Sequence, residues 1–206
     1  TGIQVIPIIA KSAESLVVFQ RTANYSIPAK NFDLTDDFKN KIKKDWIILK
    51  NKMLNSRHGH PWFEEKRSVK NTEMLIRNEI LENAWKEGGL CFRESFEDVL
   101  VDQESNDLMS DFIKKKIKDI VIDKRKAKIL SNIDHPFGTK RPPIDTDYFE
   151  TFNKNNVDIV DIKSEKIIEI NENGILTKNN DYELDVIVFA TGFDAMTGSL
   201  LKLNIF

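Results

Sequence analysis

An arginine at the end of an apolar run is the first residue whose position suggests chemistry. Arg21 follows the apolar residues 16–19 and lies 19 positions after Gly2. In a dinucleotide-binding βαβ unit, a glycine turn holds the pyrophosphate, and the end of the next strand, about 20 residues on, meets the adenosine ribose. An acid there binds the ribose of NAD, whereas an arginine receives the 2′-phosphate of NADP. Arg21 therefore predicts NADP if Gly2 is the last glycine of such a turn; otherwise it is a solvated charge at a strand end.

A pair of adjacent cations on a stiff loop forms a second candidate site. Lys140 and Arg141 lie between a Gly138-Thr139 turn and the Pro142-Pro143 pair, and prolines restrict the backbone of such a segment. Beside a Rossmann sheet, one cation could neutralise a phosphate while the other faces a reacting centre. On composition alone, a solvated surface pair is the more common explanation.

Three stretches of different pattern must position these residues. Residues 1–29 follow the order turn, helix and strand, and the apolar run at 16–19 is typical of a parallel strand that is covered on both faces. Residues 30–131 are charged and helical, and they are too many for a loop. An α/β pattern returns at 132–195. We therefore predict an α/β fold, in which a Rossmann-type domain is interrupted by an all-helical insertion.

Periodicity places individual elements more closely. Apolar residues at helical spacing predict one helix across residues 74–85 and another across 108–121, each with its apolar face in a core. In the last part of the chain, we expect a strand at 157–161, a hairpin turning at Asn171-Glu172-Asn173, and a buried strand at 185–190.

Composition excludes several classes of protein. The chain has 31 Lys and Arg against 33 Asp and Glu in 206 residues, so no overall field favours nucleic acid or an anionic membrane. No apolar stretch reaches the roughly 18 residues that span a bilayer. A single cysteine, Cys91, fits a reducing compartment, and we expect a cytoplasmic protein. His58 and His60 lack further ligands at metal spacing, so we predict no metal site.

Five segments together resemble those of a known family: residues 1–7, 18–22, 138–142, 148–153 and 185–194. The family is the flavin-dependent type I Baeyer–Villiger monooxygenases, which includes the cyclohexanone and phenylacetone monooxygenases. The similarity continues through the insertion and is weakest at residues 51–69. The combination of the Lys140-Arg141 loop with the Ala190-Thr191-Gly192-Phe193-Asp194 run is specific, and it favours a functional role for the two cations.

The resemblance implies an oxidoreductase, a flavoprotein that uses NADPH, FAD and O2. Such an enzyme inserts one oxygen atom next to the carbonyl of a small ketone and releases an ester or lactone. Arg141 matches the catalytic arginine of the family, where a fixed cation in a water-poor site stabilises anionic intermediates.

The resemblance also implies a set of cofactor-binding residues: Thr1, Gly2, Gln4, Arg21, Thr22 and Lys140. The first three match the pyrophosphate turn and the helix N-terminus, where backbone N–H groups favour phosphate. The other three match residues around the NADP 2′-phosphate, where a guanidinium and an ammonium bind as fork and point charge.

The FAD-binding domain of the family precedes this region and resumes after it. The chain opens at Thr1 without an initiator Met, so we expect an internal piece that is inactive alone, with residues 196–206 beginning the return to the FAD domain. Three alternatives stay open, of which the simplest is a helical interaction segment on an α/β scaffold. An N- or S-oxygenating flavin monooxygenase should lack both the insertion and the Lys140-Arg141 loop, whereas a non-catalytic NADPH-binding module would keep Arg21 without a use for Arg141.

Overall fold

The computed structural model describes residues 1–56, 59–61, 66–192 and 198–203. The chain divides into two compact units, of which unit 1 comprises Thr1–Thr22 with Tyr148–Phe206 and unit 2 comprises Ala23–Asp147. The described part of residues 30–131 forms helices and no strand, as the sequence predicts. The domain limits after residues 29, 131 and 195 stay a prediction. His58, Phe193, Asp194 and the limit at 195 lie outside the described residues.

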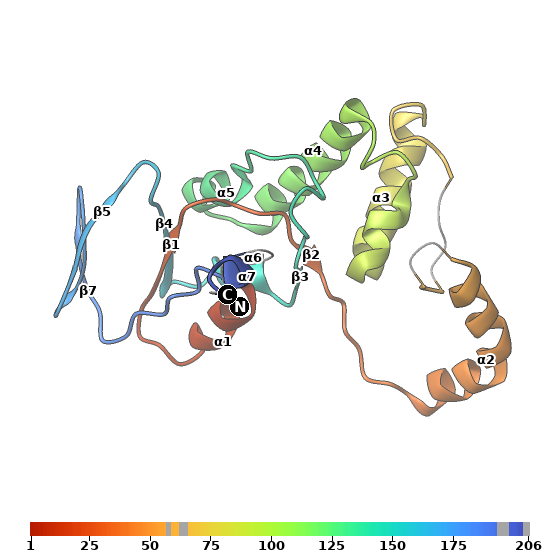
Figure 1. The fold of residues 1–206 in the computed structure, drawn as a ribbon, viewed down its shortest axis with the longest axis horizontal. Coiled ribbons are helices and arrows are strands. Elements are labelled where there is room, and N and C mark those ends of the chain that lie inside the picture. Colours follow the sequence, from red (N-terminus) through yellow and green to blue (C-terminus); the bar gives the residue numbers. More distant parts are fainter. Residues whose placement is uncertain (57–58, 62–65, 193–197, 204–206) are drawn as a thin grey trace. The chain divides into compact units, whose positions relative to one another are not determined.

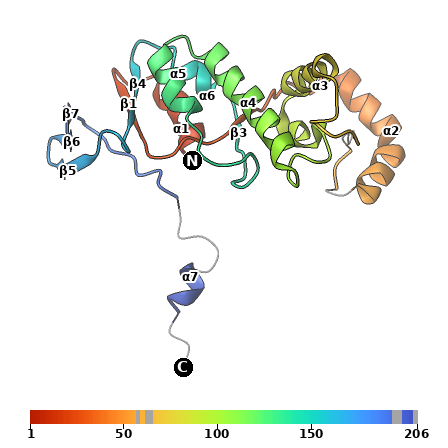
Figure 2. The same cartoon turned by 90° about the horizontal axis from the view of Figure 1, so that it is seen from above.

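Unit 1 is built on two parallel strands. Its elements in chain order are α1 (Gly2–Ile9), β1 (Leu16–Gln20), α6 (Tyr148–Thr151), β4 (Val157–Asp161), β5 (Ile167–Asn171), β6 (Gly174–Thr177), β7 (Asp181–Glu183) and α7 (Gly198–Leu201). β1 and β4 lie side by side in Figures 1 and 2, with Leu16 opposite Val157 and Gln20 opposite Asp161. The strand predicted at 157–161 is thus confirmed, and β1 is half-buried along its length.

One side chain joins α1 to this pair of strands. The Asn156 amide donates to the carbonyl oxygens of Ala10 at 3.2 Å and Ala13 at 2.9 Å. The backbone carbonyl of Asn156 in turn accepts from the Leu16 N–H at 2.8 Å. Because carbonyls at a helix end have no partner within the helix, these bonds satisfy them and fix the turn that leads from α1 into β1.

The remaining strands of unit 1 form an antiparallel sheet in the order β5-β6-β7. The predicted hairpin is confirmed, because the Asn171 carboxamide oxygen accepts from the N–H groups of Asn173 at 2.9 Å and Gly174 at 3.0 Å. Gly174 has φ of +151°, and a Cβ at this position would lie 1.9 Å from the carbonyl oxygen of Tyr182 on β7. The close approach of β7 to the hairpin therefore requires glycine here.

The prediction of a buried strand at residues 185–190 is wrong. The structure has no strand there, and Val186, Val188 and Phe189 are 75%, 53% and 71% exposed. An apolar run forms a buried strand only where neighbouring strands satisfy its backbone and other elements cover its faces. Within the described residues, no strand pairs with this segment.

Unit 2 is a helical body with one short parallel pair of strands. Its elements are β2 (Ile27–Pro28), α2 (Asp36–Asn55), α3 (Met74–Glu87), the 3-10 helix η1 (Gly89–Ser95), α4 (Gln103–Ile120), α5 (Lys124–Ser131) and β3 (Ile144–Asp145). α3 and α4 confirm the two predicted helices. Phe92 lies at the centre of the core, with its ring centroid 5.6 Å from that of Trp85, 6.0 Å from Phe112 and 6.2 Å from Phe137.

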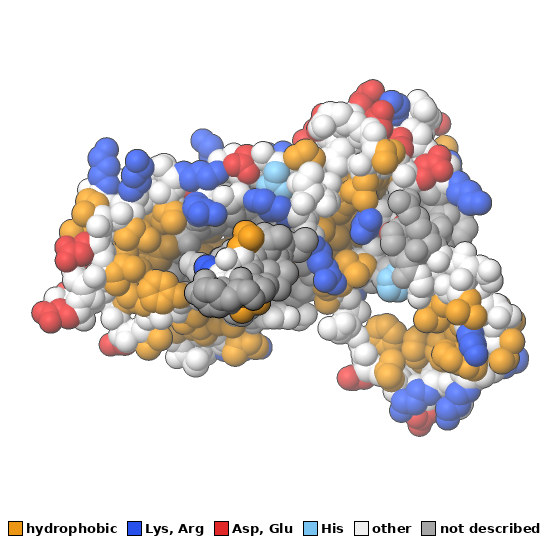
Figure 3. Space-filling model, viewed as in Figure 1, with side chains coloured by type: hydrophobic (Ala, Val, Ile, Leu, Met, Phe, Trp, Pro, Cys, Tyr) orange, Lys and Arg blue, Asp and Glu red, His pale blue; other side chains and the backbone are white. Residues whose placement is uncertain are grey.

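The apolar face predicted for α3 is only partly in the core. Leu81 and Trp85 are buried, but Met74 and Leu75 at the start of the helix are 61% and 70% exposed. α2 also carries exposed apolar side chains, which gather on the face drawn in Figure 3. Periodicity identifies which residues share a helix face, but it does not say whether another element covers that face.

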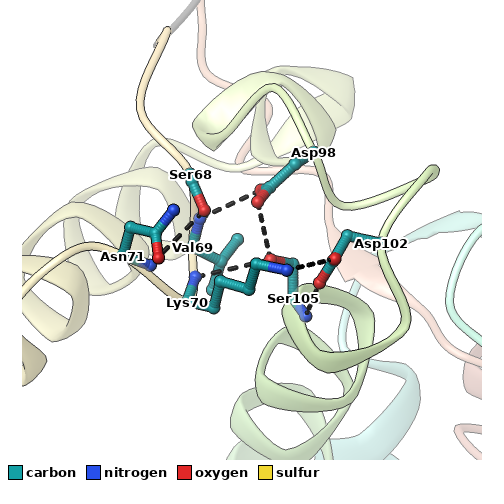
Figure 4. Close-up of polar contacts among 7 residues, drawn as sticks. All are labelled: Ser68, Val69, Lys70, Asn71, Asp98, Asp102 and Ser105. Atoms are coloured by element: carbon teal, nitrogen blue, oxygen red, sulfur yellow. Dashed lines mark hydrogen bonds and ion pairs between the residues drawn. The ribbon is translucent and has the colours of Figure 1, made fainter.

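A polar cluster holds the segment before α3 against the start of α4 (Figure 4). The Asp98 carboxylate accepts from the Val69 N–H at 2.9 Å and from the Ser105 hydroxyl at 2.7 Å. Lys70 forms an ion pair with Asp102, which also caps α4 by accepting from the Ser105 N–H at 3.0 Å. Two segments about 30 residues apart in sequence are therefore joined mainly through carboxylates.

We expect Asp98→Asn to lower the free energy of unfolding by about 1–3 kcal/mol at pH 7. Burial raises the pKa of the Asp98 carboxyl, but the hydrogen bonds from Ser68, Ser105 and the Val69 N–H outweigh it, and the pKa lies below its usual value of 3.8. A carboxyl whose pKa is lower in the folded than in the unfolded chain stabilises the fold at any pH above its unfolded pKa. This stabilisation is lost as the pH falls through the folded pKa. Urea unfolding of the wild type and of Asp98→Asn should give free energies of unfolding that differ at pH 7, and this difference should narrow below about pH 4.

Asp119→Asn, which changes an exposed carboxylate near the end of α4, is the control for this measurement. It should leave the free energy of unfolding within about 0.5 kcal/mol of the wild type at both pH values. A gap between wild type and Asp98→Asn that stays constant down to pH 3 would show that the carboxylate charge is not what stabilises the cluster.

Neither a membrane span nor a metal-binding cluster is found in the part of the chain that the structure describes. No described helix is both long and apolar enough to cross a bilayer. No group of three or more His, Cys, Asp or Glu side chains is placed there to hold a metal ion.

Candidate functional site

Arg21 and Thr22 leave the carboxyl end of β1 in unit 1. β1 is parallel to β4, and ligands of open α/β sheets bind outside the carboxyl ends of the strands. Arg21 is exposed and Thr22 is half-buried. Among the described residues, Arg21 has no carboxylate partner, so its charge is available to an anion.

The start of α1 is the second part of the site in unit 1. The Thr1 carbonyl accepts from the N–H groups of Gln4 and Val5, each at 3.0 Å, but the Thr1 side chain makes no capping bond and the first turn carries no acid. The positive end of the helix is therefore not neutralised by its own side chains, which suits a phosphate. A Cβ on Gly2 would lie 3.8 Å from the Ala190 Cβ, an ordinary contact, so packing alone does not require glycine there.

In unit 2, the Lys140-Arg141 loop begins at a firmly held residue. The Phe137 ring is buried beside Phe92 and Tyr25. The Phe137 backbone is bound by Asn106 of α4, whose carboxamide accepts from the Phe137 N–H at 2.9 Å and donates to the Phe137 carbonyl at 2.8 Å. Both the side chain and the backbone of this residue are thus fixed in the core.

The turn that follows Phe137 depends on glycine. Gly138 has φ of +86°, and a Cβ there would lie 2.4 Å from the Leu100 Cδ2 atom. The Thr139 hydroxyl donates to the Pro136 carbonyl at 2.8 Å, and Phe137 forms an isolated bridge with Lys140. These contacts close a tight turn immediately before the two cations.

The loop is held again immediately after Arg141. The Pro143 carbonyl accepts from the Ile27 N–H at 3.0 Å, and the Asp145 carbonyl accepts from the Ala29 N–H at 2.7 Å, which pairs β3 with β2. Lys140 and Arg141 are exposed between these two anchors. Neither side chain has an ion-pair partner in the part of the chain that the structure describes.

Residues before the loop add a third anchor. The Tyr25 hydroxyl donates to the His135 carbonyl at 2.9 Å, and the two rings contact edge to face. The His135 Nε2 atom lies 3.0 Å from the Asn24 Oδ1 atom. Burial raises the pKa of the Tyr25 hydroxyl, so it remains a donor across the neutral range.

The sequence analysis missed the residues that hold the loop, namely Asn24, Tyr25 and Asn106. Asn106 could have been found, because it lies three residues before Met109 and seven before Ile113 on the buried face of α4. A polar residue in an apolar stripe needs a hydrogen-bond partner in the core. Of the seven site residues that the sequence predicts, five lie in unit 1 and two in unit 2. Their roles stay a prediction.

Comparison with known proteins connects these features to one family. No family model matches the chain. The cyclohexanone 1,2-monooxygenase of Acinetobacter sp is 38% identical over 209 residues, and a Baeyer-Villiger monooxygenase of Pseudooceanicola batsensis is 36% identical over 208 residues. The chain is homologous to the Baeyer–Villiger monooxygenases. Each of these comparisons covers 100% of this chain, which spans 38% of the length of each relative.

The fold of this Baeyer–Villiger homologue agrees with that relationship. A solved structure of an oxidized steroid monooxygenase bound to NADP superposes with a TM-score of 0.92 at 43% identity, over 97% of this chain and 38% of that chain. The predicted α/β fold, with a helical insertion in a Rossmann-type region, is thereby confirmed.

One relative corrects a criterion drawn from the sequence. A phenazine N-monooxygenase of Lysobacter antibioticus is 34% identical over 212 residues, covering 100% of this chain and 38% of its own length. The similarity therefore includes the insertion, which an N-oxygenating enzyme was expected to lack. The insertion does not by itself distinguish carbon oxygenation from nitrogen oxygenation.

Proposed function

We propose that this chain is part of an NADPH- and FAD-dependent cytoplasmic monooxygenase, which inserts one oxygen atom from O2 next to the carbonyl of a small ketone to give an ester or lactone. The observation that carries the proposal is the anchored loop, which presents Lys140 and Arg141 as exposed cations without ion-pair partners in the described chain. Homology to the cyclohexanone and Baeyer–Villiger enzymes supplies the reaction class.

We assign the binding of NADP to residues of each unit. The resemblance assigns the 2′-phosphate to Arg21 and Thr22 of unit 1 and to Lys140 of unit 2, and it assigns the pyrophosphate to the start of α1 at Thr1, Gly2 and Gln4. The absence of an acid from the first turn of α1 supports this arrangement. Residues 1–29 and 132–195 would then form the NADP domain, and residues 30–131 its insertion.

Arg141 is the residue that we assign to the reaction itself. FAD, when bound, supplies the redox chemistry that activates O2. Arg141 would hold a permanent positive charge near the oxygen atoms that become negative during the insertion, and its rigid loop would keep it there without reorganisation. The anchors at Phe137 and Pro143 support this role, because they fix the backbone on both sides of the guanidinium.

N-oxygenation of an aromatic heterocycle is the second candidate, favoured by the likeness to the phenazine N-monooxygenase. The two reactions differ in their products. The purified full-length protein should be given a cyclic ketone and a phenazine in turn with NADPH and 18O2. A labelled lactone supports the first candidate, whereas a labelled N-oxide and no lactone would overturn it.

Arg21→Ala should raise the Michaelis constant for NADPH by about 10- to 150-fold in the full-length protein, which corresponds to about 1.5–3 kcal/mol of charge-assisted hydrogen bonding. The constant for NADH should barely change, because NADH has no 2′-phosphate. Steady-state rates with each cofactor, at saturating ketone, provide both constants.

Two further variants make this measurement specific. Lys178→Ala removes an exposed cation from the turn after β6 and should leave both constants unchanged, while Arg21→Lys should recover part of the NADPH preference. If Arg21→Ala raised the Michaelis constants for NADPH and NADH by the same factor, then the assignment of the 2′-phosphate to this residue would be contradicted.

A further inference from the structure

The carboxamide of Asn106 uses its full hydrogen-bonding capacity in the core of unit 2. Its Oδ1 atom accepts from the Phe137 N–H at 2.9 Å and from the Ser110 hydroxyl at 3.3 Å. Its Nδ2 atom donates to the carbonyl oxygens of Phe137 and Val99, each at 2.8 Å. An amide side chain has two donors and two principal acceptor sites, and the residue is only 5% exposed, so the carboxamide is committed to these three partners.

We propose that Asn106 is a positioning residue for the Lys140-Arg141 loop. It binds the N–H and the C=O of Phe137 together, and this pair of bonds fixes the two peptide groups on either side of the Phe137 Cα, where the loop starts. The proposal rests on the proposed function, since it adds the residue that places the two functional cations.

The backbone must place Lys140 and Arg141, because their side chains have no fixed partner in the described chain. Both are exposed, and neither forms an ion pair there. The path from Asn106 to the cations is short and stiff: Phe137, Gly138 at φ of +86°, and Thr139, whose hydroxyl is bonded to Pro136. A displacement of the Phe137 peptide is therefore carried directly to the cations.

A purely structural asparagine would behave differently. Its loss would lower stability, but it would leave the loop where the Phe137 ring and the β2–β3 pair hold it. The two roles are separated by a matched variant of the same helix, Ile117→Ala. Ile117 is fully buried and lies eleven residues further along α4, about 16 Å from Asn106 along the helix axis.

Hydrogen exchange of the full-length protein is the direct test. In Asn106→Ala, the amides of residues 137–141 should exchange at least about tenfold faster than in Ile117→Ala when the two are compared at the same distance below their unfolding temperatures. Equal exchange in this segment would overturn the proposal, whatever happens to activity.

Kinetics provide the second readout. Asn106→Ala should lower kcat for the ketone by about 10- to 100-fold and should also raise the Michaelis constant for NADPH, since a misplacement of about 1 Å reduces rates on this scale. Ile117→Ala should change neither beyond its effect on stability. If kcat and the Michaelis constant for NADPH in Asn106→Ala both equalled those in Ile117→Ala, the positioning role would be overturned.

The direct variants Lys140→Ala and Arg141→Ala distinguish failure of this inference from failure of the proposed function. If neither direct variant affects turnover or NADPH use, then the proposed function fails, while the exchange experiment still decides whether Asn106 holds the loop. If both direct variants act and Asn106→Ala does not, then only the positioning role fails.

Ser110→Ala covers the case in which Asn106→Ala does not fold. It removes the hydroxyl that donates to the Asn106 Oδ1 atom and leaves the carboxamide in place. Exchange of residues 137–141 should then rise by about two- to fivefold, with a smaller fall in kcat. Exchange indistinguishable from the wild type in this segment would count against the proposal.

Discussion

Arg141→Ala in the full-length protein should reduce ester or lactone formation by about 10²- to 10³-fold. The guanidinium is a fixed cation on a loop that is anchored through Phe137 on one side and Pro143 on the other. Loss of that charge leaves the developing negative oxygen atoms without a counter-charge, while the residues proposed for the 2′-phosphate are untouched. NADPH should therefore still bind with nearly its original affinity.

Product formation and cofactor binding must be measured separately to test this result. Gas chromatography of the ester gives turnover, and equilibrium titration with NADP gives binding. Lys140→Ala is the neighbouring control: it should weaken discrimination between NADPH and NADH and reduce turnover far less at saturating NADPH. An Arg141→Ala enzyme that converts ketone at the original rate would refute the role assigned to this arginine.

Gly174→Ala should lower the free energy of unfolding by about 3 kcal/mol or more, which is among the larger effects of a single substitution. The new Cβ would lie 1.9 Å from the backbone carbonyl of Tyr182, and φ is +151°. The obstruction is backbone on a paired strand, so β7 would have to leave its register with β6. Urea unfolding monitored by circular dichroism gives the free energy.

Gly192→Ala is the matched control for the steric part of this effect. Gly192 also has a positive φ, +90°, but apart from its chain neighbours no atom of the described residues lies within 4 Å of a Cβ placed there. Its substitution should cost only the backbone strain, about 1–2 kcal/mol. Equal losses in the two variants would show that the contact with Tyr182 contributes nothing.

Elements whose sequence signal is local were predicted well. The hairpin around Asn171 needs only its own side chain to close, and α4 has an apolar face that repeats over several turns. The segment at 185–190 has an equally strong apolar signal, but its state depends on strands and helices elsewhere. Sequence periodicity records how a segment could be buried, not whether its partners are within reach.

The candidate site was predicted in part for the same reason. Arg21 and the Lys140-Arg141 pair stand out by charge and by their neighbours in sequence, and a family resemblance gave them roles. Asn106 bonds to Phe137, 31 residues away, and no local pattern pairs the two. Contacts of this kind are set by the packing of α4 against the loop, which becomes visible only in the folded chain.

The first turns of α4 hold two distant parts of the chain at once. Ser105 bonds to Asp98 and to the Lys70 N–H, and Asn106, the next residue, bonds to Phe137. The effects of substitutions in the segment before α3 and in the loop that carries Lys140 and Arg141 are therefore not independent, because both segments are bonded to the first turns of α4. In a deep mutational scan, we expect epistasis between these segments: a change near Lys70 that is neutral alone should become harmful when Ser110 or Thr139 is also altered.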